Sequence, residues 1–290
     1  MALARALADG GVEHARTEAR LLVEEVSGYR GAEWSDVASQ AVSERSEIRL
    51  RGLCERRLRG EPLQYVLGSW GFRGLDLMVD ARVLIPRPET EWVVEVALAE
   101  AERVGLRRVL RRPALDAATR AVVADLGTGS GAIALALEQA LPDTEVWATD
   151  ASEDALAVAS ANAAGCGATR VRLASGSWFD ALPGPLRGRL ALVVSNPPYI
   201  AEGEVSTLPA EVVDHEPRRA LVSGPTGMEA IRHLVAAAPS WLAERSVLVC
   251  EIAPHQAEAA TELAVRAGFS GVFVRSDLAR RPRVLVARRG

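Results

Sequence analysis

One short segment limits the folds open to this chain more than any other: the glycine-rich run at 125–131, Asp-Leu-Gly-Thr-Gly-Ser-Gly. It follows an apolar run, Ala121–Leu126, that predicts a buried strand, and it leads into a helical pattern over Gly131–Leu141. Glycines between a strand and a helix allow a sharp backbone turn and let a ligand approach the main chain closely. The segment therefore predicts an α/β domain with a ligand-binding loop at the end of a strand.

Strand-like and helical patterns alternate from residue 121 to the end, which predicts a mainly parallel sheet covered by helices on both faces. The last two strand-like runs, Val272–Ser276 and Val284–Ala287, are too close together for a parallel crossover, so we expect them to pair antiparallel. The other expected strands are Glu145–Thr149, Val171–Ala174, Leu190–Ser195 and Val247–Ile252, and the expected helices are Ser152–Ala164, Gly227–Leu242 and His255–Ala267.

The N-terminal part has a different pattern, with apolar residues at helical spacing from Ala15 to Val26 and again over Ser43–Arg59. We expect residues 1–66 to form a small helical domain that recognises the substrate. Residues 67–91 form a bridge, in which Phe72–Val79 and Arg82–Ile85 are expected to pair as a hairpin. Residues 92–290 then form the α/β domain, with a helix from about Trp92 and an arginine-rich connector at 103–120 before the first strand.

Composition excludes several classes of protein. The chain has 290 residues, is 49% apolar and carries a net charge of −4, which is typical of a globular protein and weighs against general nucleic-acid binding. No apolar run reaches the roughly 18 residues of a membrane span, and no secretory signal is present, so we expect a cytoplasmic protein without membrane contact. Its three cysteines lie far apart, so no metal site is expected.

The spacing of the glycine-rich loop discriminates between ligand classes. Dinucleotide enzymes use Gly-x-Gly-x-x-Gly, whereas this loop has Gly-x-Gly-x-Gly with Asp125 in front of it. An acidic side chain there repels a pyrophosphate and attracts an ammonium, which favours the aminoacyl end of S-adenosylmethionine. A second strand ends in Asp150, whose carboxylate suits ribose hydroxyls. A dinucleotide and a ligand-free turn are the alternatives, and Trp178 either flanks the adenine or packs in the core.

A second motif, Asn196-Pro197-Pro198-Tyr199, follows the strand Leu190–Ser195. The carboxyl ends of parallel strands face the ligand crevice, so the motif is expected beside the glycine-rich loop. Two prolines make a stiff segment without N–H donors. The Asn196 side chain and the Pro197 carbonyl can then accept both hydrogens of a planar –NH₂ group, with Tyr199 lying flat against it. Positioning and acceptors that stabilise developing positive charge would supply the catalysis. A surface turn is the alternative.

Asn196-Pro197-Pro198-Tyr199 resembles the signature of amino-methyltransferases that act on DNA adenine, RNA guanine or protein glutamine. Other segments narrow the resemblance to the HemK/PrmC family, whose members methylate the glutamine of the Gly-Gly-Gln motif in class-1 peptide-chain release factors. These segments are Gly60–Tyr65, Leu84–Glu91, Glu216-Pro217, Ala220-Leu221, Glu251 and Gln256. Ser177 departs from the family, which often has Asp before the tryptophan.

The resemblance implies a class I methyltransferase sheet of the Rossmann type, mainly parallel with an antiparallel last strand, plus the N-terminal helical domain. It implies S-adenosylmethionine as cofactor, a release factor as partner, no direct nucleic-acid contact and a monomer. Asn196 would be the catalytic residue, and Asn196, Pro197, Pro198 and Tyr199 would hold the substrate glutamine. The implied cofactor contacts are Gly127, Thr128, Gly129, Ser130, Gly131, Asp150, Trp178 and Asn196. The resemblance also implies that Phe72 and the Arg87–Glu91 segment lie near the active site.

Three rival functions stay open at this point. The first is an amino-methyltransferase that acts on adenine or guanine of a nucleic acid, because it would use the same chemistry. Such enzymes usually carry a basic face and a target-recognition region, whereas this chain is mildly acidic and its extra domain is helical. The others are a non-catalytic module that binds cofactor or a translation factor, and a NAD-dependent oxidoreductase, which the loop spacing disfavours.

Overall fold

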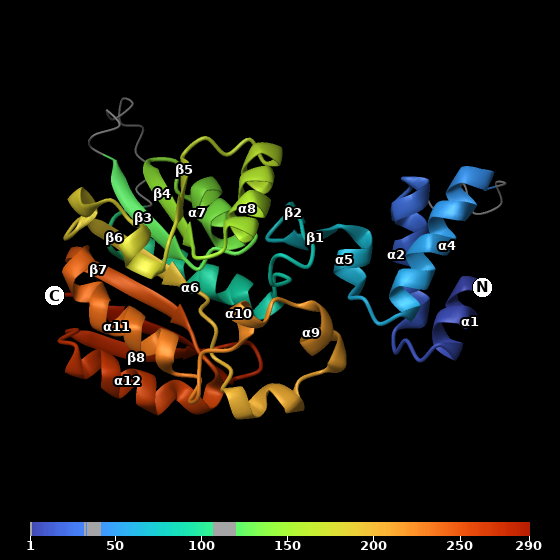
Figure 1. Ribbon diagram of the computed structural model, residues 1–290. Coiled ribbons are helices and arrows are strands. Elements are labelled where there is room, and N and C mark those ends of the chain that lie inside the picture. Colours follow the sequence, from blue (N-terminus) through green and yellow to red (C-terminus); the bar gives the residue numbers. More distant parts are fainter. Residues whose placement is uncertain (1, 32, 34–41, 107–119) are drawn as a thin grey trace. The chain divides into compact units, whose positions relative to one another are not determined.

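The computed structural model describes residues 2–31, 33, 42–106 and 120–290, which divide into two compact units (Figure 1). The smaller unit comprises Met1–Ser69 together with Pro209–His215, and the larger comprises Trp70–Leu208 with Glu216–Gly290. The arginine-rich connector falls mostly outside the described residues. No helix of the described ranges combines the length and apolar character that a bilayer crossing requires.

The smaller unit is helical. Its buried cluster combines Leu7, Leu22, Cys54 and Val66 with two small residues of the second helix, Ala15 and Ala19. Its helices are α1 (Ala2–Asp9), α2 (Ala15–Ser27), α4 (Glu44–Leu58), α5 (Leu63–Leu67) and α9 (Ala210–His215).

An arginine joins three of the helices in the smaller unit. The half-buried guanidinium of Arg57 in α4 bonds the carboxylate of Glu18 in α2 at 2.6 Å and that of Glu211 in α9 at 2.9 Å. The α9 segment is therefore tied by an ion pair to helices about 150 residues earlier in the sequence. The apolar pattern of the N-terminal residues contains no sign of this contribution.

The larger unit opens with a hairpin at a different place from the one expected. Strands β1 (Ser69–Phe72) and β2 (Leu75–Met78) pair around Arg73-Gly74, which both have positive φ, at 49° and 79°. Such a two-residue turn matches the twist of paired strands. The predicted hairpin around Asp80-Ala81 is wrong, because Asp80 instead accepts the N–H of Arg82 in a local turn. Residues 82–85 form no strand.

The sheet of the larger unit has seven strands in the order β5-β4-β3-β6-β7-β9-β8. The first five in that order run parallel, and β9 is antiparallel to both of its neighbours, as the sequence predicts. The strands are β3 (Ala121–Leu126), β4 (Thr144–Asp150), β5 (Val171–Ser175), β6 (Leu190–Ser195), β7 (Leu242–Glu251), β8 (Gly271–Ser276) and β9 (Pro282–Arg288).

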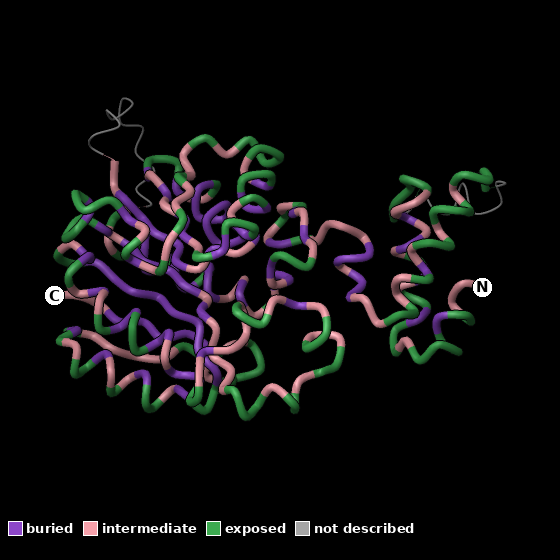
Figure 2. The backbone as a smooth tube through the Cα atoms, viewed as in Figure 1, coloured by how far each residue is buried: buried purple, intermediate pink, exposed green. Residues whose placement is uncertain are grey.

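Side chains that alternate along the strands build two apolar layers. Val123 of β3 packs with helices α6 and α7 on one face, whereas Val122 and Ala124 pack with α11 and α12 on the other. Figure 2 shows the strands as the buried centre of this unit. The larger helices are α6 (Pro88–Arg103), α7 (Ala132–Ala140), α8 (Glu153–Gly165), α11 (Glu229–Trp241) and α12 (Ala257–Arg266).

Short helical segments complete the larger unit and connect its strands. They are the 3₁₀ turns η2 (Trp178–Ala181), η3 (Gly184–Leu186), η4 (Glu202–Thr207) and η5 (Pro254–Gln256), and the short helix α10 (Arg218–Leu221). Helix α6 begins at Pro88, four residues before the expected start. Proline suits the first turn of a helix because the missing N–H would have no partner there. The earlier start brings Thr90 into a buried helical turn.

Candidate functional site

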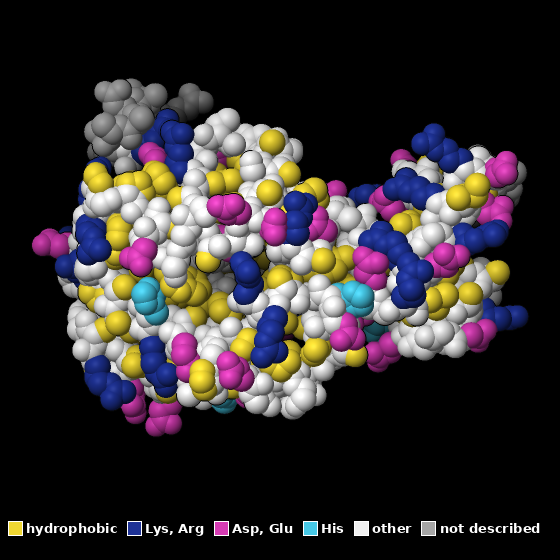
Figure 3. Space-filling view, in the orientation of Figure 1, with side chains coloured by type: hydrophobic (Ala, Val, Ile, Leu, Met, Phe, Trp, Pro, Cys, Tyr) yellow, Lys and Arg dark blue, Asp and Glu magenta, His cyan; other side chains and the backbone are white. Residues whose placement is uncertain are grey.

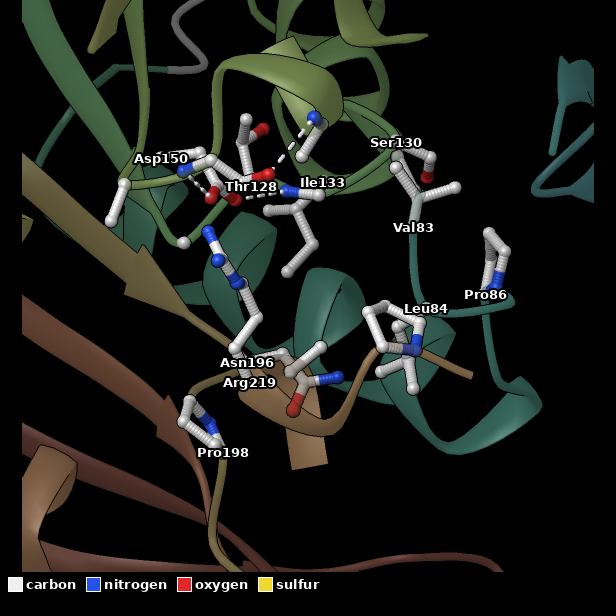
Figure 4. Close-up of a pocket in the computed structure, with 18 of the residues that line it drawn as sticks. Val83, Leu84, Pro86, Thr128, Ser130, Ile133, Asp150, Asn196, Pro198 and Arg219 are labelled. Atoms are coloured by element: carbon white, nitrogen blue, oxygen red, sulfur yellow. Dashed lines mark hydrogen bonds between the residues drawn. The ribbon is translucent and has the colours of Figure 1, made fainter. Parts of the chain in front are cut away.

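A pocket opens at the carboxyl ends of β3, β4 and β6, where an open α/β sheet binds its ligands. The space-filling view shows this hollow with basic side chains beside it (Figure 3). The close-up shows Thr128 and Asp150 on one side and Asn196 and Pro198 on the other (Figure 4). The guanidinium of Arg219 points toward the Thr128–Asp150 side. All lining residues belong to the larger unit.

The glycine-rich loop follows β3 and turns sharply into α7. Gly127, Gly129 and Gly131 all have positive φ, at 76°, 55° and 85°, which a residue with a Cβ rarely adopts. A Cβ on Gly127 would also stand 3.1 Å from the Trp178 ring. The loop is anchored to β4, because the N–H groups of Gly127 and Thr128 donate to the Thr149 carbonyl at 2.9 Å. The main chain therefore forms the floor of the pocket.

Asp150 is held ready to accept hydrogen bonds. One carboxylate oxygen accepts the N–H of Gly129 and the other accepts the N–H of Ser152, both at 2.9 Å. Each oxygen of a carboxylate can accept more than one hydrogen bond, so both keep accepting capacity toward the pocket. A pair of vicinal hydroxyls, such as those of a ribose, suits this geometry.

The aromatic residues after β5 have separate roles. Trp178 is half-buried, lines the pocket and packs against Gly127. Its φ of 50° is unusual for a bulky residue, and its carbonyl accepts the hydroxyl of Thr149 at 3.3 Å. Phe179 is buried in the core and stacks on Trp241 with ring centroids 5.7 Å apart. Of the two rings, only Trp178 faces the pocket.

Asp125 does not face the pocket, contrary to its expected role with an ammonium group. Its side chain is fully buried, and one carboxylate oxygen accepts the Thr128 hydroxyl at 2.6 Å and the Ala134 N–H at 3.1 Å. Burial raises the pKa of this carboxyl to about 7, against the hydrogen bonds from Thr128 and Ala134. Asp125 therefore fastens the loop to α7 from behind.

Asn196-Pro197-Pro198-Tyr199 continues directly from β6. Asn196 and Pro198 line the pocket, whereas Pro197 is buried behind them. The Nδ2 of Asn196 donates to the Thr90 hydroxyl at 2.9 Å, which leaves its Oδ1 for a ligand. Tyr199 is half-buried against the core and is not among the residues that line the pocket. Burial and the nearby Glu251 raise the pKa of its hydroxyl.

Side chains outside the motif hold the Asn196–Tyr199 segment at both of its ends. Buried Gln256 donates from Nε2 to the carbonyls of Tyr199 and Gly227, at 2.9 and 3.0 Å. A Cβ on Gly227 would stand 2.6 Å from the Tyr199 carbonyl oxygen, so only glycine fits there. At the start of the segment, the Ser195 hydroxyl donates to the Leu126 carbonyl at 2.7 Å and joins the ends of β6 and β3.

The structure brings the expected loop, Asp150, Trp178, Asn196 and Pro198 around one pocket. Thr90, within the segment that the resemblance places near the site, lines it as well, and so does Arg219, which the sequence did not single out. Arg87, placed near the site by resemblance, also lines it and pairs with the buried carboxylate of Glu216, while Phe72 is a core residue. Across the described ranges, no group of His, Cys, Asp or Glu is arranged to hold a metal ion.

Comparison with known proteins gives matches over most of the chain. The family described as PrmC N-terminal domain matches residues 2–68, and the one described as Methyltransferase small domain matches residues 109–245. A release factor glutamine methyltransferase of Deinococcus radiodurans is 38% identical over 283 residues, which are 98% of this chain and 94% of the relative. The protein of that name from Bordetella pertussis is 41% identical over 273 residues, 94% of each chain.

Solved structures share the fold at much lower identity. The hMettl16 catalytic domain in complex with the MAT2A 3′UTR hairpin 1 has a TM-score of 0.57 at 15% identity, over 85% of this chain and 81% of that one. A methyltransferase from Pyrococcus furiosus has a TM-score of 0.53 at 17% identity, over 84% of this chain and 99% of that one. At such identities the likeness supports the class I methyltransferase fold alone.

Proposed function

This chain belongs to the family of release factor glutamine methyltransferases, and from that membership we propose that it transfers a methyl group from S-adenosylmethionine to the side-chain amide nitrogen of a release-factor glutamine. The observation that carries the proposal is the meeting of two motifs in one pocket. Residues 127–130 of the cofactor loop and an amide-accepting side chain, Asn196, line the same hollow.

The pocket's lining suits S-adenosylmethionine. Asp150 keeps accepting capacity for ribose hydroxyls, Trp178 offers an aromatic face for an adenine, and Gly127 leaves room where a Cβ would crowd the Trp178 ring. We therefore assign the cofactor contacts to Gly127, Thr128, Gly129, Ser130, Gly131, Asp150, Trp178 and Asn196. When bound, the cofactor supplies an electrophilic methyl group on sulfur.

The residues on the other side of the pocket act on the acceptor. An amide nitrogen is a weak nucleophile because its lone pair is delocalised, and positive charge develops on it as it gains a methyl group. The Oδ1 of Asn196 is free to accept one amide hydrogen, because Nδ2 is already bonded to Thr90. The Pro197 carbonyl would accept the other. Acceptors fixed in advance stabilise such charge without reorganising during the reaction.

The proposed substrate segment is Asn196–Tyr199, although its residues differ in exposure. Asn196 and Pro198 reach the pocket directly, while Pro197 is buried and Tyr199 lies half-buried beneath the surface. Pro197 would act through its carbonyl, and Pro198 and Tyr199 would flank the planar amide. Because proline has no backbone N–H, neither of these two positions offers a donor that would compete with the substrate for acceptors.

We assign the finer features as follows. The target is the glutamine of the Gly-Gly-Gln motif in class-1 release factors, and the enzyme acts as a cytoplasmic monomer. The helical residues 1–66 recognise the release factor, since every described residue that lines the pocket belongs to the larger unit. A chain without residues 1–66 should keep cofactor affinity and lose methylation of the release factor. Normal turnover by that chain would refute this assignment.

The test of the proposed function locates the methyl group. The enzyme is incubated with S-adenosylmethionine and a release factor, and the product is digested and sequenced by tandem mass spectrometry. We expect the methyl group on the side chain of the Gly-Gly-Gln glutamine. A methyl group on another residue would show a different specificity, and an unmodified release factor would refute the proposal.

A further inference from the structure

A chain of three side chains leads from the pocket to a buried carboxylate. Asn196 donates from Nδ2 to the Thr90 hydroxyl at 2.9 Å, and Thr90 donates to the Oε2 of Glu251 at 2.8 Å. Thr90 is 4% exposed and Glu251 1% exposed. The register of the sheet explains why Asn196 and Glu251 lie close together. Ser195, the last residue of β6, lies opposite Cys250 of β7, so Asn196, which follows β6, comes beside Glu251, the last residue of β7.

Glu251 determines the direction of the hydrogen bonds that link Asn196, Thr90 and Glu251. An ionised carboxylate only accepts, so the Thr90 hydroxyl must donate its single hydrogen to Glu251. The Thr90 oxygen can then only accept from Asn196, which turns the Asn196 Nδ2 inward and its Oδ1 outward. Rotation of an asparagine amide by half a turn exchanges donor and acceptor. Without the carboxylate, both orientations of Asn196 would find a partner in Thr90.

The same carboxylate also contacts the far end of the segment. The Tyr199 hydroxyl lies 3.4 Å from Oε1 of Glu251 and donates to it. Glu251 therefore contacts Tyr199 directly and Asn196 through Thr90. Burying a carboxylate is costly, and a buried ionic group is often neutral or destabilising compared with an apolar one. Its presence beneath a reacting segment points to a role in orientation.

We propose that Glu251 is a positioning residue for methyl transfer: through Thr90 it holds the Asn196 amide with its oxygen toward the acceptor nitrogen. This inference rests on the function proposed above and adds a residue that contacts neither cofactor nor substrate. Loss of Glu251 should lower the rate of transfer and leave cofactor affinity nearly unchanged, because the groups assigned to ribose and adenine lie on the opposite side of the pocket.

Protonation of Glu251 gives the inference a pH dependence. Burial raises the pKa of this carboxyl to about 7, and nearby Glu89 raises it further, while Thr90, Arg283 and Tyr199 lower it. Cys250 also adjoins it, and burial raises the pKa of that thiol. A proton on Oε2 makes Glu251 a donor to Thr90, which then donates to Asn196 and favours the reversed amide. The working form is the ionised one, so activity should fall as pH decreases through about 7.

The experiment measures kcat, KM for the release factor and cofactor Kd between pH 5.5 and 9. It compares the wild type with Glu251→Gln, Thr90→Val and Thr90→Ser, and uses Glu258→Gln on the exposed side of α12 as the matched control. We expect Glu251→Gln and Thr90→Val to lower kcat about 10- to 100-fold, the range found for outer partners that orient ligands in metal sites. Thr90→Ser keeps the hydroxyl and should recover most of the rate.

The pH profiles separate orientation from simple loss of structure. The acid limb of kcat near pH 7 should be present in the wild type and in Glu258→Gln, and absent from Glu251→Gln. Cofactor Kd should stay within about threefold in all variants, under 0.7 kcal/mol. Wild-type kcat in Glu251→Gln, or an unchanged acid limb in that variant, would overturn the inference. So would a Thr90→Ser variant as slow as Thr90→Val.

A second readout does not depend on the substrate. The side-chain ¹⁵NH₂ resonance of Asn196, assigned by comparison with Asn196→Asp, should shift with a midpoint near pH 7 in the wild type and stay constant in Glu251→Gln. A resonance that titrates equally in both proteins would refute the role of Glu251, whatever the enzyme methylates. Failure of the wild type to methylate a release factor, with this titration present, would instead refute the proposed function alone.

Discussion

The two sides of the pocket are held in place by different means. On the cofactor side, main-chain groups of Gly127–Gly131 and the Asp150 carboxylate bond one another across a short loop. On the acceptor side, Asn196 depends on Thr90 and Glu251, which lie 106 positions before it and 55 after it in the sequence. The first side is supported mainly by main-chain N–H groups that bond the end of β4, and the second is a short motif supported by side chains from distant elements.

This difference has a functional consequence. A loop of glycines and main-chain N–H groups presents fixed dipoles that suit a ligand held in one pose. A side-chain amide held by a threonine and a carboxylate keeps two possible orientations, and its environment selects between them. We therefore expect changes on the cofactor side to alter affinity and changes on the acceptor side to alter rate.

The largest expected effect is that of Asn196→Ala. Removing the acceptor that stabilises charge in the transition state should lower kcat about 10²- to 10³-fold, as loss of one oxyanion-hole donor does. Cofactor Kd should change only several-fold, because Asp150 and the loop are untouched. Steady-state kinetics and calorimetric titration of the cofactor measure the two quantities. Near-normal turnover would disprove the role of Asn196.

The opposite pattern should follow from Asp150→Ala. The variant loses acceptors for ribose hydroxyls and also frees the N–H groups of Gly129 and Ser152, so cofactor Kd should rise about 10- to 100-fold. At saturating cofactor, kcat should fall much less. Asp150→Asn keeps one accepting oxygen, so its cofactor Kd should lie between those of the wild type and Asp150→Ala. A fall in kcat at saturation as large as that of Asn196→Ala would break the division between the sides.

Buried carboxyls on the two sides should differ in their effects on activity. Burial raises the pKa values of Asp125 and Glu251 to about 7, so the folded state binds protons that the unfolded state releases near pH 4. The free energy of unfolding should therefore fall as pH rises from about 4 to about 7. Asp125→Asn should raise stability at pH 8 by about 1–2 kcal/mol and weaken this slope.

Urea unfolding at several pH values measures the slope. Asp125→Asn should leave the acid limb of kcat in place, because Asp125 lies behind the loop and does not contact Asn196. Glu251→Gln should change both the pH dependence of the free energy of unfolding and the acid limb of kcat. A stability difference between Asp125→Asn and the wild type that does not vary with pH would contradict the raised pKa of Asp125.

The smallest expected effect belongs to the bond that joins the two sides. Ser195→Ala removes the hydroxyl that donates to the Leu126 carbonyl and should destabilise the protein by about 1 kcal/mol. Both cofactor Kd and kcat should change slightly, since the bond links the ends of β3 and β6. Ser240→Ala, at an exposed hydroxyl, is the matched control. A Ser195→Ala variant as stable as the wild type would show that the bond contributes nothing.

The same difference explains which features could be predicted from the sequence. The alternation of strands and helices predicts the mainly parallel sheet, and the short spacing of the last two strands predicts the antiparallel β9, because periodicity and spacing are local signals. Gly127–Gly131, Asp150 and Asn196 stand at strand ends, where the chemistry of the residue and its position agree. Local signals were thus sufficient to bring Asp150 and residues of the loop to one pocket, but not to orient Asp125.

The other features of the site and the position of the hairpin depend on contacts that no local sequence pattern encodes. Thr90 enters the site because α6 begins at Pro88 and packs beside β7, and Glu251 enters through the register of β6 with β7. Asp125 was expected to face the ligand, yet the turn of the loop directs its carboxylate toward α7. The hairpin turns at Arg73-Gly74 and not at Asp80-Ala81, because both residues of the first pair adopt the positive φ that a two-residue turn requires.

The most direct test of the proposed function measures transfer of a labelled methyl group to three acceptors in parallel. The enzyme and labelled S-adenosylmethionine are offered a release factor, the same factor with alanine in place of the Gly-Gly-Gln glutamine, and DNA or RNA. The proposed function predicts label on the intact release factor and on neither of the other acceptors. Label on the nucleic acid with an unlabelled release factor would keep the fold and contradict the assigned substrate.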